Sequence, residues 1–372
     1  MKVALHVDQL WFRAPGGIGT YVRELLTALA QEEPALELVP FRSTFTPTST
    51  WPVELEGSAV IVPGSLRRLY PSWALLSRPA LPQALAVADV VHATNPAAVP
   101  PIRRGQRLVV TVHDLAFELF PELFPRDWRW LYRAGLRAAA KRADAIIVPS
   151  SAAADDVAMR SSFDRAQIHI TPLASSVATT DADPSETSRR LDVPQPYILS
   201  VGTLEPRKNL VRLVRAYRQV APEIPHALVL AGPPGWRVEE LEAEIARPGP
   251  GTILRTGRLS GRDLDALYRG AEAFAYPSLY EGFGLPVVEA MVRGVPTITS
   301  NTSSLPEVAG DAALLVDPED TGEIAEALAR VLTDPVLAED LRRRGRERAA
   351  MFSWTATARA TLDVYRHVTG AS

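Results

Sequence analysis

The sequence predicts an α/β protein with two doubly wound domains, each a parallel sheet covered by helices on both faces. Short, almost wholly apolar stretches alternate with stretches of helical period, a pattern typical of buried parallel strands. A proline-containing polar stretch, 172–196, interrupts this alternation near the middle of the chain. A length of 372 residues also exceeds that of one ordinary domain.

Composition narrows the function classes. A net charge of −3 argues against a general nucleic-acid binder, which needs a basic excess. The absence of cysteine excludes disulfides, thiolate metal sites and a cysteine nucleophile, and it fits a reducing compartment. The N-terminal apolar run ends at Asp8 without a cleavage site, and no run approaches the roughly 18 apolar residues of a membrane span. We therefore expect a cytoplasmic protein, soluble or at most peripheral at a membrane.

The first domain is expected to occupy residues 1–175. After the first strand we expect a loop that carries Gly16 and Gly17, then a helix over 20–31, and residues 41–57 read as a long loop because they are rich in Ser, Thr and Pro. The glycine loop lacks the third glycine of a dinucleotide fingerprint, which disfavours a dehydrogenase. The expected strands are 2–7, 36–40, 59–62, 90–93, 108–112, 145–149 and 168–171.

The second domain is expected to occupy residues 176–353, with 172–196 as the linker. Its strands are expected at 197–201, 227–231, 252–256, 273–276, 297–300 and 313–316, and its helices near Asn209, Trp236, Ser260, Pro286 and Asp320. Only helices are expected after Pro335.

Residues 277–295 combine two carboxylates with a helix start. Glu281 and Glu289 flank a Gly-Phe-Gly-Leu-Pro turn, in which the glycines allow a tight bend and Pro286 suits a first helical turn. Such a helix start attracts anions. Two acids beside it suggest a ligand with both a phosphate and hydroxyl groups.

Other polar residues follow expected strands, where parallel sheets bind ligands. Arg207 and Lys208 are suited to neutralising a diphosphate leaving group, although a solvated turn is the alternative. His113 and Asp114 form either a structural pair or a contact to sugar hydroxyls, and no serine elbow accompanies them.

Two further features remain open or are rejected. Asp181 and Asp183 match a short metal-binding signature, but they lie in the linker and read as a helix-capping or solvated segment, so we predict no metal. The helix 126–141 carries a cationic stripe beside aromatic residues, which is either a solvated face or an edge that meets anionic lipid or an anionic acceptor. The stripe consists of Arg126, Arg129, Arg133, Arg137 and Lys141.

With these motifs assembled, the chain resembles family 4 glycosyltransferases, which are retaining enzymes with the GT-B fold. The resemblance rests on GGIGTY, TVHDL, VGTLEPRKN and above all the block 256–320, and the VGTLEPRKN form is most similar to bacterial mannosyltransferase-like members. It implies two domains that face each other across a cleft, an acceptor domain and a donor domain, with a final helix, 354–372, that crosses back onto the first.

The resemblance also implies roles for individual residues. Thr203 stands where the family often has arginine, so Arg207 would supply that charge. The implied roles are Gly16 and Gly17 near the diphosphate and acceptor, His113 at the transferred sugar, Arg207 and Lys208 at the diphosphate, Glu281 at the sugar hydroxyls, the backbone of Phe283, Gly284 and Leu285 at sugar and phosphate, Glu289 at the ribose, and Arg258 and Leu259 at the base.

The resulting expectation is transfer of a hexosyl unit, mannosyl or glucosyl in type, from a GDP- or UDP-sugar to a hydroxyl acceptor such as a glycan, a lipid or a small molecule, without a further cofactor. The acid pair invites a double displacement with Glu281 as nucleophile. The resemblance instead implies reaction on one face, in which the departing phosphate assists deprotonation of the acceptor. The alternatives are another GT-B enzyme, such as an epimerase or a phosphorylase, and a non-catalytic nucleotide-sugar binding protein.

Overall fold

The computed structural model describes residues 1–12, 16–44 and 58–370. Their contacts divide the chain into two compact units. Unit 1 comprises Met1–Leu173 and Trp354–Ser372, and unit 2 comprises Ala174–Ser353.

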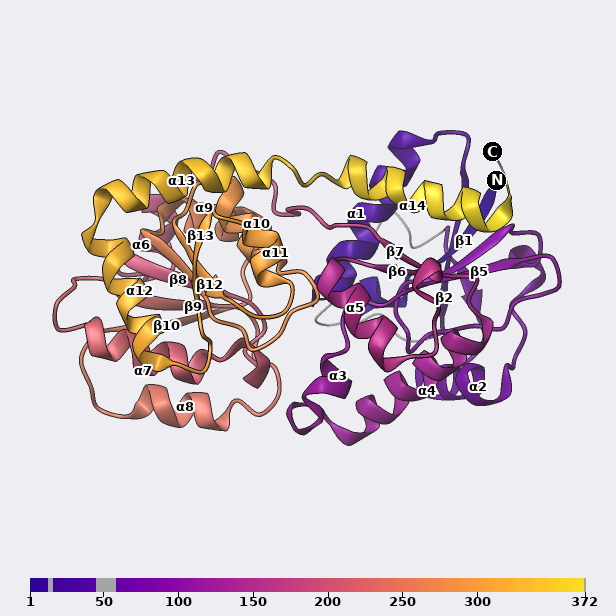
Figure 1. Cartoon of the computed structure of the whole chain (residues 1–372), viewed down its shortest axis with the longest axis horizontal. Helices are drawn as coiled ribbons and strands as arrows, with labels where there is room; N and C mark the ends of the chain where they lie inside the picture. The colour runs from indigo at the N-terminus through magenta and orange to yellow at the C-terminus, as the bar shows by residue number, and fades with distance from the viewer. Residues whose placement is uncertain (13–15, 45–57, 371–372) are drawn as a thin grey trace. The chain divides into compact units, whose positions relative to one another are not determined.

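Unit 1 is built on a seven-stranded parallel sheet with the order β3-β2-β1-β4-β5-β6-β7 (Figure 1). Helix α14 packs against α1, and α2 packs against α4. The strands are β1 (Lys2–His6), β2 (Glu37–Ser43), β3 (Val60–Val62), β4 (Val90–Ala93), β5 (Arg107–Thr111), β6 (Ala145–Val148) and β7 (Ile168–Ile170). The helices are α1 (Gly16–Glu32), α2 (Leu66–Leu76), α3 (Ala116–Leu119), α4 (Arg126–Arg142), α5 (Ser151–Arg160) and α14 (Trp354–Thr369), with 3-10 turns η1 (Asp8–Trp11), η3 (Gln83–Leu85), η4 (Pro121–Leu123) and η5 (Arg165–Gln167).

Unit 2 is built on a six-stranded parallel sheet with the order β10-β9-β8-β11-β12-β13 (Figure 1). Helix α7 packs against α8 and α12, whereas α10 packs against α11 and α13. The strands are β8 (Tyr197–Val201), β9 (Ala227–Ala231), β10 (Ile253–Gly257), β11 (Ala273–Tyr276), β12 (Thr297–Ser300) and β13 (Ala313–Val316). The helices are α6 (Pro184–Arg190), α7 (Leu210–Val220), α8 (Glu239–Ala246), α9 (Gly261–Gly270), α10 (Leu285–Val292), α11 (Leu305–Ala309), α12 (Thr321–Thr333) and α13 (Pro335–Ala349), with the 3-10 turn η6 (Pro206–Lys208).

The two sheets confirm the predicted fold class. Every strand pair is parallel, and each sheet has a point where the strand order reverses, between β1 and β4 in unit 1 and between β8 and β11 in unit 2. In doubly wound sheets, ligands bind beyond the carboxyl ends of the strands at this point. The turn that contains Arg207 and Lys208 follows β8, and Glu281 follows β11.

Two local predictions were wrong. Helix α1 begins at Gly16, not at residue 20, because the amides of a first turn need no intrahelical acceptor and glycine is tolerated there. Strand β2 continues to Ser43, whose amide donates to Asp8 Oδ1 at 2.6 Å, so residues 41–43 are not loop. The linker contains α6, and the side chain of Asp183 caps it, which agrees with the helix-capping interpretation of this segment. Residues 45–57 of the expected loop lie outside the described residues.

Candidate functional site

The turn after β8 and the loop after β11 meet because their strands are neighbours in the sheet. The carbonyl of Arg207 accepts a hydrogen bond from the amide of Leu279 at 2.9 Å, which joins the two segments. Arg207 and Lys208 therefore come directly beside Glu281, although more than 70 positions separate them along the chain.

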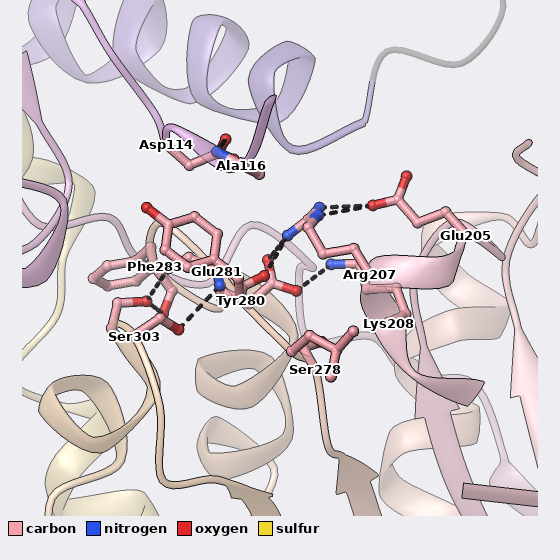
Figure 2. A network of polar contacts seen from close by, with 12 residues as sticks. Asp114, Ala116, Glu205, Arg207, Lys208, Ser278, Tyr280, Glu281, Phe283 and Ser303 are labelled. Atoms are coloured by element: carbon pink, nitrogen blue, oxygen red, sulfur yellow. Dashed lines mark hydrogen bonds and ion pairs between the residues drawn. The ribbon is translucent and has the colours of Figure 1, made fainter. Parts of the chain in front are cut away.

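Glu281 lies at the centre of a buried ionic network (Figure 2). Its Oε1 accepts from Lys208 Nζ at 2.6 Å and from the Tyr276 hydroxyl at 2.9 Å. Its Oε2 accepts from Arg207 Nη1 at 2.6 Å. Arg207 also reaches Glu205, whose Oε1 lies 2.7 Å from Nη2 and 3.1 Å from Nε. Two cations and two carboxylates thus balance each other within one cluster.

The charges in this cluster keep Glu281 ionised. Burial alone would raise the pKa of its carboxyl group, but Arg207 and Lys208 lower that pKa to about 2. Burial and the neighbouring Arg207 lower the pKa of Lys208, against the opposing effect of Glu281 and Glu205. Burial and Glu281 raise the pKa of Tyr276 well above its ordinary value. At neutral pH Tyr276 is therefore a hydrogen-bond donor to the carboxylate.

The turn before α10 has the shape expected of an anion site. Gly284 is the N-cap at φ 108°, and a Cβ there would lie 2.7 Å from Leu305 Cδ2, so glycine is required. The Ser304 hydroxyl donates to the carbonyls of Glu281 and Phe283, both at 2.9 Å, and these hydrogen bonds hold the backbone of the turn in place. Pro286 occupies the first turn of the helix, as predicted. The amide of Val287 donates to the carbonyl of Gly284 at 2.9 Å and Pro286 has no N–H, so it is mainly the helix dipole that favours an anion at this helix start.

Glu289 is buried, and its carboxylate accepts hydrogen bonds from two hydroxyl groups. Its Oε2 accepts from the Tyr268 hydroxyl at 2.9 Å, and its Oε1 from the Ser176 hydroxyl at 3.3 Å. Burial and Glu289 raise the pKa of Tyr268 well above its ordinary value, so this hydroxyl stays protonated. Arg293 covers the Tyr268 ring at 5.3 Å. A carboxylate that already accepts from hydroxyl groups has the chemistry needed to bind the hydroxyls of a ribose.

In unit 1, His113 follows β5 and is held as a neutral ring. Its Nε2 donates to the Thr94 carbonyl at 2.9 Å, and its ring meets the edge of Tyr21 at 4.8 Å. Burial lowers the pKa of His113, which leaves Nδ1 unprotonated and able to accept a hydrogen bond. The carboxylate of Asp114 accepts from the amide of Ala116 at 2.9 Å. His113 and Asp114 therefore each have a partner of their own.

The same unit contains a chain of buried hydrogen bonds that leads to α14. Tyr21 bonds to the Thr111 hydroxyl at 2.9 Å, and that hydroxyl lies 2.7 Å from His92 Nε2. His92 Nδ1 lies 2.6 Å from the Tyr365 hydroxyl. Tyr21 belongs to α1, the helix that starts with Gly16 and Gly17, and its ring also contacts the ring of His113. One packed region therefore connects these three predicted residues.

The other predicted residues occupy less enclosed positions. Thr203 is half-buried just beyond β8. Arg258 is exposed and Leu259 half-buried, both just beyond β10. The acid pair of the linker behaves as predicted for a capping or solvated segment, since Asp183 caps α6 and Asp181 is exposed and paired with Arg262. Among residues 1–12, 16–44 and 58–370 there is no cluster of three histidine or acidic side chains that would suit a metal.

Helix α4 carries the cationic stripe. Trp128 and Trp130 expose 52% and 49% of their surface, and Arg126, Arg137 and Lys141 are exposed on the same helix. Arg133 instead forms two bonds of 2.8 Å to Glu118. No helix in the described part of the chain is both long and apolar enough to cross a membrane.

Sequence reasoning missed Glu205, Tyr276 and Tyr268. Glu205 lies in the same turn as Arg207, and an acid two residues before a proposed phosphate ligand was the available signal. The tyrosines gave no such signal, because a tyrosine at the end of a strand or within a helix is ordinarily a core residue. Their roles depend on carboxylates brought to them by the fold.

Comparison with known proteins agrees with this geometry. Two family models match the chain, Glycosyltransferase Family 4 over residues 15–174 and Glycosyl transferases group 1 over residues 183–348. The O-antigen chain mannosyltransferase B of Escherichia coli is 35% identical over 270 residues, which cover 71% of each chain. The serotype-specific mannosyltransferase WbdA of the same organism is 33% identical over 284 residues, which cover 72% of this chain but only 34% of that longer protein. The sucrose-phosphate synthase structure from Thermosynechococcus elongatus shares the fold over 100% of both chains, with a TM-score of 0.77 and 23% identity.

Proposed function

The chain belongs to the family 4 glycosyltransferases and is a hexosyltransferase that uses a nucleotide-sugar donor, and we propose that the group it transfers is mannose. The main structural support is the buried cluster of Glu281, Arg207 and Lys208 beside the start of α10. Mannose is supported by the two relatives described above, both mannosyltransferases.

Unit 2 would bind the donor. Lys208 and the start of α10 would contact the diphosphate, Glu281 the hydroxyls of the transferred sugar, and Glu289 the ribose. The hydroxyl partners of Glu289 support this division, since ribose hydroxyls can donate hydrogen bonds to the carboxylate in the same way. Thr203, Arg258 and Leu259 follow strands of the same sheet and are proposed as further donor contacts.

Unit 1 would bind the acceptor. The unprotonated Nδ1 of His113 would accept a hydrogen bond from a sugar hydroxyl, and Gly16 and Gly17 would allow backbone to approach the ligands. The proposed acceptor is a hydroxyl group of a glycan, as the name of the first relative suggests.

We propose that the reaction retains the anomeric configuration and proceeds on one face of the sugar. Both oxygens of Glu281 already accept hydrogen bonds from cations, and its pKa of about 2 makes it a weak nucleophile. These contacts support an orienting role for Glu281 in place of a double displacement. The departing phosphate would then assist deprotonation of the acceptor hydroxyl.

The test is incubation of the protein with GDP-mannose or UDP-glucose, with and without mannose-terminated oligosaccharides. Acceptor-dependent transfer of mannose, with an α-linkage in the product by NMR, is the expected result. Release of free sugar without an acceptor, or a requirement for inorganic phosphate, would favour the epimerase or phosphorylase alternative. Tight binding of the donor without any turnover would favour a binding protein. A covalent sugar adduct at Glu281 would establish double displacement.

We also propose that α4 docks unit 1 on an anionic membrane surface. Exposed indole rings and exposed cations on one helix are residues typical of helices that bind at a lipid interface. Sedimentation with anionic vesicles at low salt should carry the protein down, and Trp128→Ser with Trp130→Ser should abolish this. Met159→Ser on α5 removes an even more exposed apolar side chain and should have no effect. Failure of the wild-type protein to sediment would remove the proposal.

A further inference from the structure

Arg207 is already bound by protein groups. Its Nη1 donates to Glu281 Oε2 at 2.6 Å and to the Tyr280 carbonyl at 2.8 Å. Its Nε and Nη2 both donate to Glu205 Oε1. A guanidinium has five N–H groups, and these bonds use at least four of them. Arg207 cannot present its planar fork to a phosphate without breaking several charge-assisted hydrogen bonds.

Lys208 is placed differently. Its ammonium group donates to Glu281 Oε1 at 2.6 Å and to the Tyr276 hydroxyl at 2.5 Å. An ammonium group has three N–H donors, so among the residues that the structure describes these two bonds leave the third for a ligand. Of the two adjacent cations, Lys208 is therefore the one able to bind a diphosphate in the arrangement observed.

Glu205 explains why Arg207 stays where it is. Its side chain is buried, and its carboxylate accepts from Nε and Nη2 of the guanidinium, whereas Glu281 accepts from Nη1. Arg207 is thus clamped between two acids, with the carbonyl of Tyr280 as a third fixed acceptor (Figure 2). Breaking one side of a buried ion pair leaves a costly uncompensated charge, so this arrangement resists rearrangement.

We propose that Glu205 and Arg207 are a positioning pair that holds the Glu281 carboxylate toward the transferred sugar, and that Lys208 alone provides the diphosphate contact from this turn. The proposal deepens the proposed function and rests on its assignment of Glu281 to the sugar. It also assigns Arg207 a role other than the diphosphate contact expected from the sequence, because Thr203 leaves Arg207 as the only arginine of this turn and the fold uses it internally.

Removing Arg207 should change the pH dependence of turnover in a known direction. Arg207 and Lys208 both lower the pKa of Glu281, so without Arg207 that pKa rises and activity is lost at a higher pH on the acid side. The groups that face Glu281 are Arg207 and Lys208 from the turn after β8, Tyr276 from β11, Ser303 and Ser304 from the loop after β12, and Glu205 behind Arg207.

The test compares Arg207→Met with Lys208→Ala, using GDP and UDP as binding probes and the sugar nucleotide for turnover. For Arg207→Met we expect the nucleotide Kd within threefold of wild type, kcat reduced at least tenfold and the acid limb of the kcat profile shifted to higher pH. For Lys208→Ala we expect the Kd to rise at least tenfold. Arg215→Met, which removes an arginine paired with Glu240 and Glu244 on the same unit, should change neither quantity.

Two further variants protect the test against misfolding. The double variant Glu205→Gln with Arg207→Met removes one negative and one positive charge. We therefore expect it to fold and to keep the low kcat of Arg207→Met. Glu205→Ala should lower kcat without tightening nucleotide binding. Loss of nucleotide affinity in Arg207→Met equal to that in Lys208→Ala, or tighter binding in Glu205→Ala, would show that Arg207 is a diphosphate ligand and overturn the proposal. Failure of the wild-type protein to bind either nucleotide would instead contradict the proposed function.

Discussion

Glu281 and Glu289 belong to one motif, yet their carboxylates lie in different surroundings. Glu281 is held by two cations, whereas Glu289 accepts from the hydroxyls of Tyr268 and Ser176. Neutral hydroxyl partners are easily exchanged for those of a ligand, but ionic partners in a buried site are not. Two glutamates in one stretch of sequence thus differ in their hydrogen-bonding partners. This difference favours a donor-binding motif over a catalytic acid pair.

At this scale, Lys208→Ala should abolish transfer without unfolding the protein. Removal of a preorganised cation from a developing phosphate charge costs about a hundredfold or more in kcat. Arg207 remains to neutralise Glu281, so the fold should persist. Steady-state turnover and thermal unfolding of the same preparation check both parts, and turnover close to that of wild type would contradict the role given to Lys208.

The segment that leads into unit 2 is attached to α9 and α10 by a buried ion pair. Asp265, which is fully buried, accepts from the amide and hydroxyl of Thr180 and pairs with Arg293 Nε at 2.8 Å. Arg293 also donates to the carbonyl of Val177. A stretch that reads as a loose linker in the sequence is therefore bound tightly beside Glu289.

Asp265→Ala should destabilise unit 2 by about 3–5 kcal/mol, because it leaves Arg293 buried without its counter-ion. The pH dependence has a defined sign. Burial by itself would raise the pKa of Asp265, but the hydrogen bonds from Thr180 and the ion pair with Arg293 lower this pKa below 3.8. The stability that Asp265 provides is fully present above the pKa that this residue has in the unfolded chain. It is lost as the pH falls through the lower pKa that Asp265 has in the folded protein. Denaturant titrations at pH 7 and pH 3 should show a smaller difference between variant and wild type at pH 3. Arg262→Ala, an exposed pair with Asp181, serves as the control and should have little effect.

Helix α14 should stabilise unit 1 through its apolar face and Tyr365 more than through its surface charges. Tyr365 is fully buried, and its hydroxyl bonds to His92. We expect Tyr365→Ala to lower the free energy of unfolding by about 3–5 kcal/mol, as alanine substitutions of other large buried aromatic side chains do. Arg359→Ala, which removes an exposed pair with Glu32, should cost less than about 1 kcal/mol. Urea unfolding measures both, and similar losses for the two variants would contradict this ranking.

At the scale of the whole molecule, the two units have separate sheets and separate hydrophobic cores. Unit 2 is one continuous segment, whereas unit 1 needs both ends of the chain. Because of this difference in connectivity, unit 2 corresponds to a single continuous fragment of the chain, whereas unit 1 does not.

We therefore expect residues 174–353 alone to fold and to bind a nucleoside diphosphate without catalysing transfer. A ligand that binds only the folded state at a hundred times its Kd stabilises it by about 2.7 kcal/mol, so GDP or UDP should raise the unfolding midpoint. The same fragment with Glu289→Ala should show a smaller rise. A folded fragment that responds to neither nucleotide, beside a full chain that does, would contradict the assignment of the donor to unit 2.

The sequence alone determined the fold class, the family and the residues that gather at the strand ends. These features are local or periodic: apolar runs that alternate with helical stretches, Gly284 and Pro286 at a helix start, and the block 256–320 that carries the family resemblance. Both sheets, the cap at Asp183 and the matches to the family models confirm these predictions.

Only the tertiary structure decided the strand order and the partners of the charged side chains. The neighbouring positions of β8 and β11 bring Glu281 to Arg207 across 74 positions, and the docking of α14 brings Tyr365 to His92 across 273. Such pairs depend on packing between distant segments, which leaves no period or spacing in the sequence. For the same reason Glu205 was passed over: its role exists only because the guanidinium of Arg207 is turned between two acids.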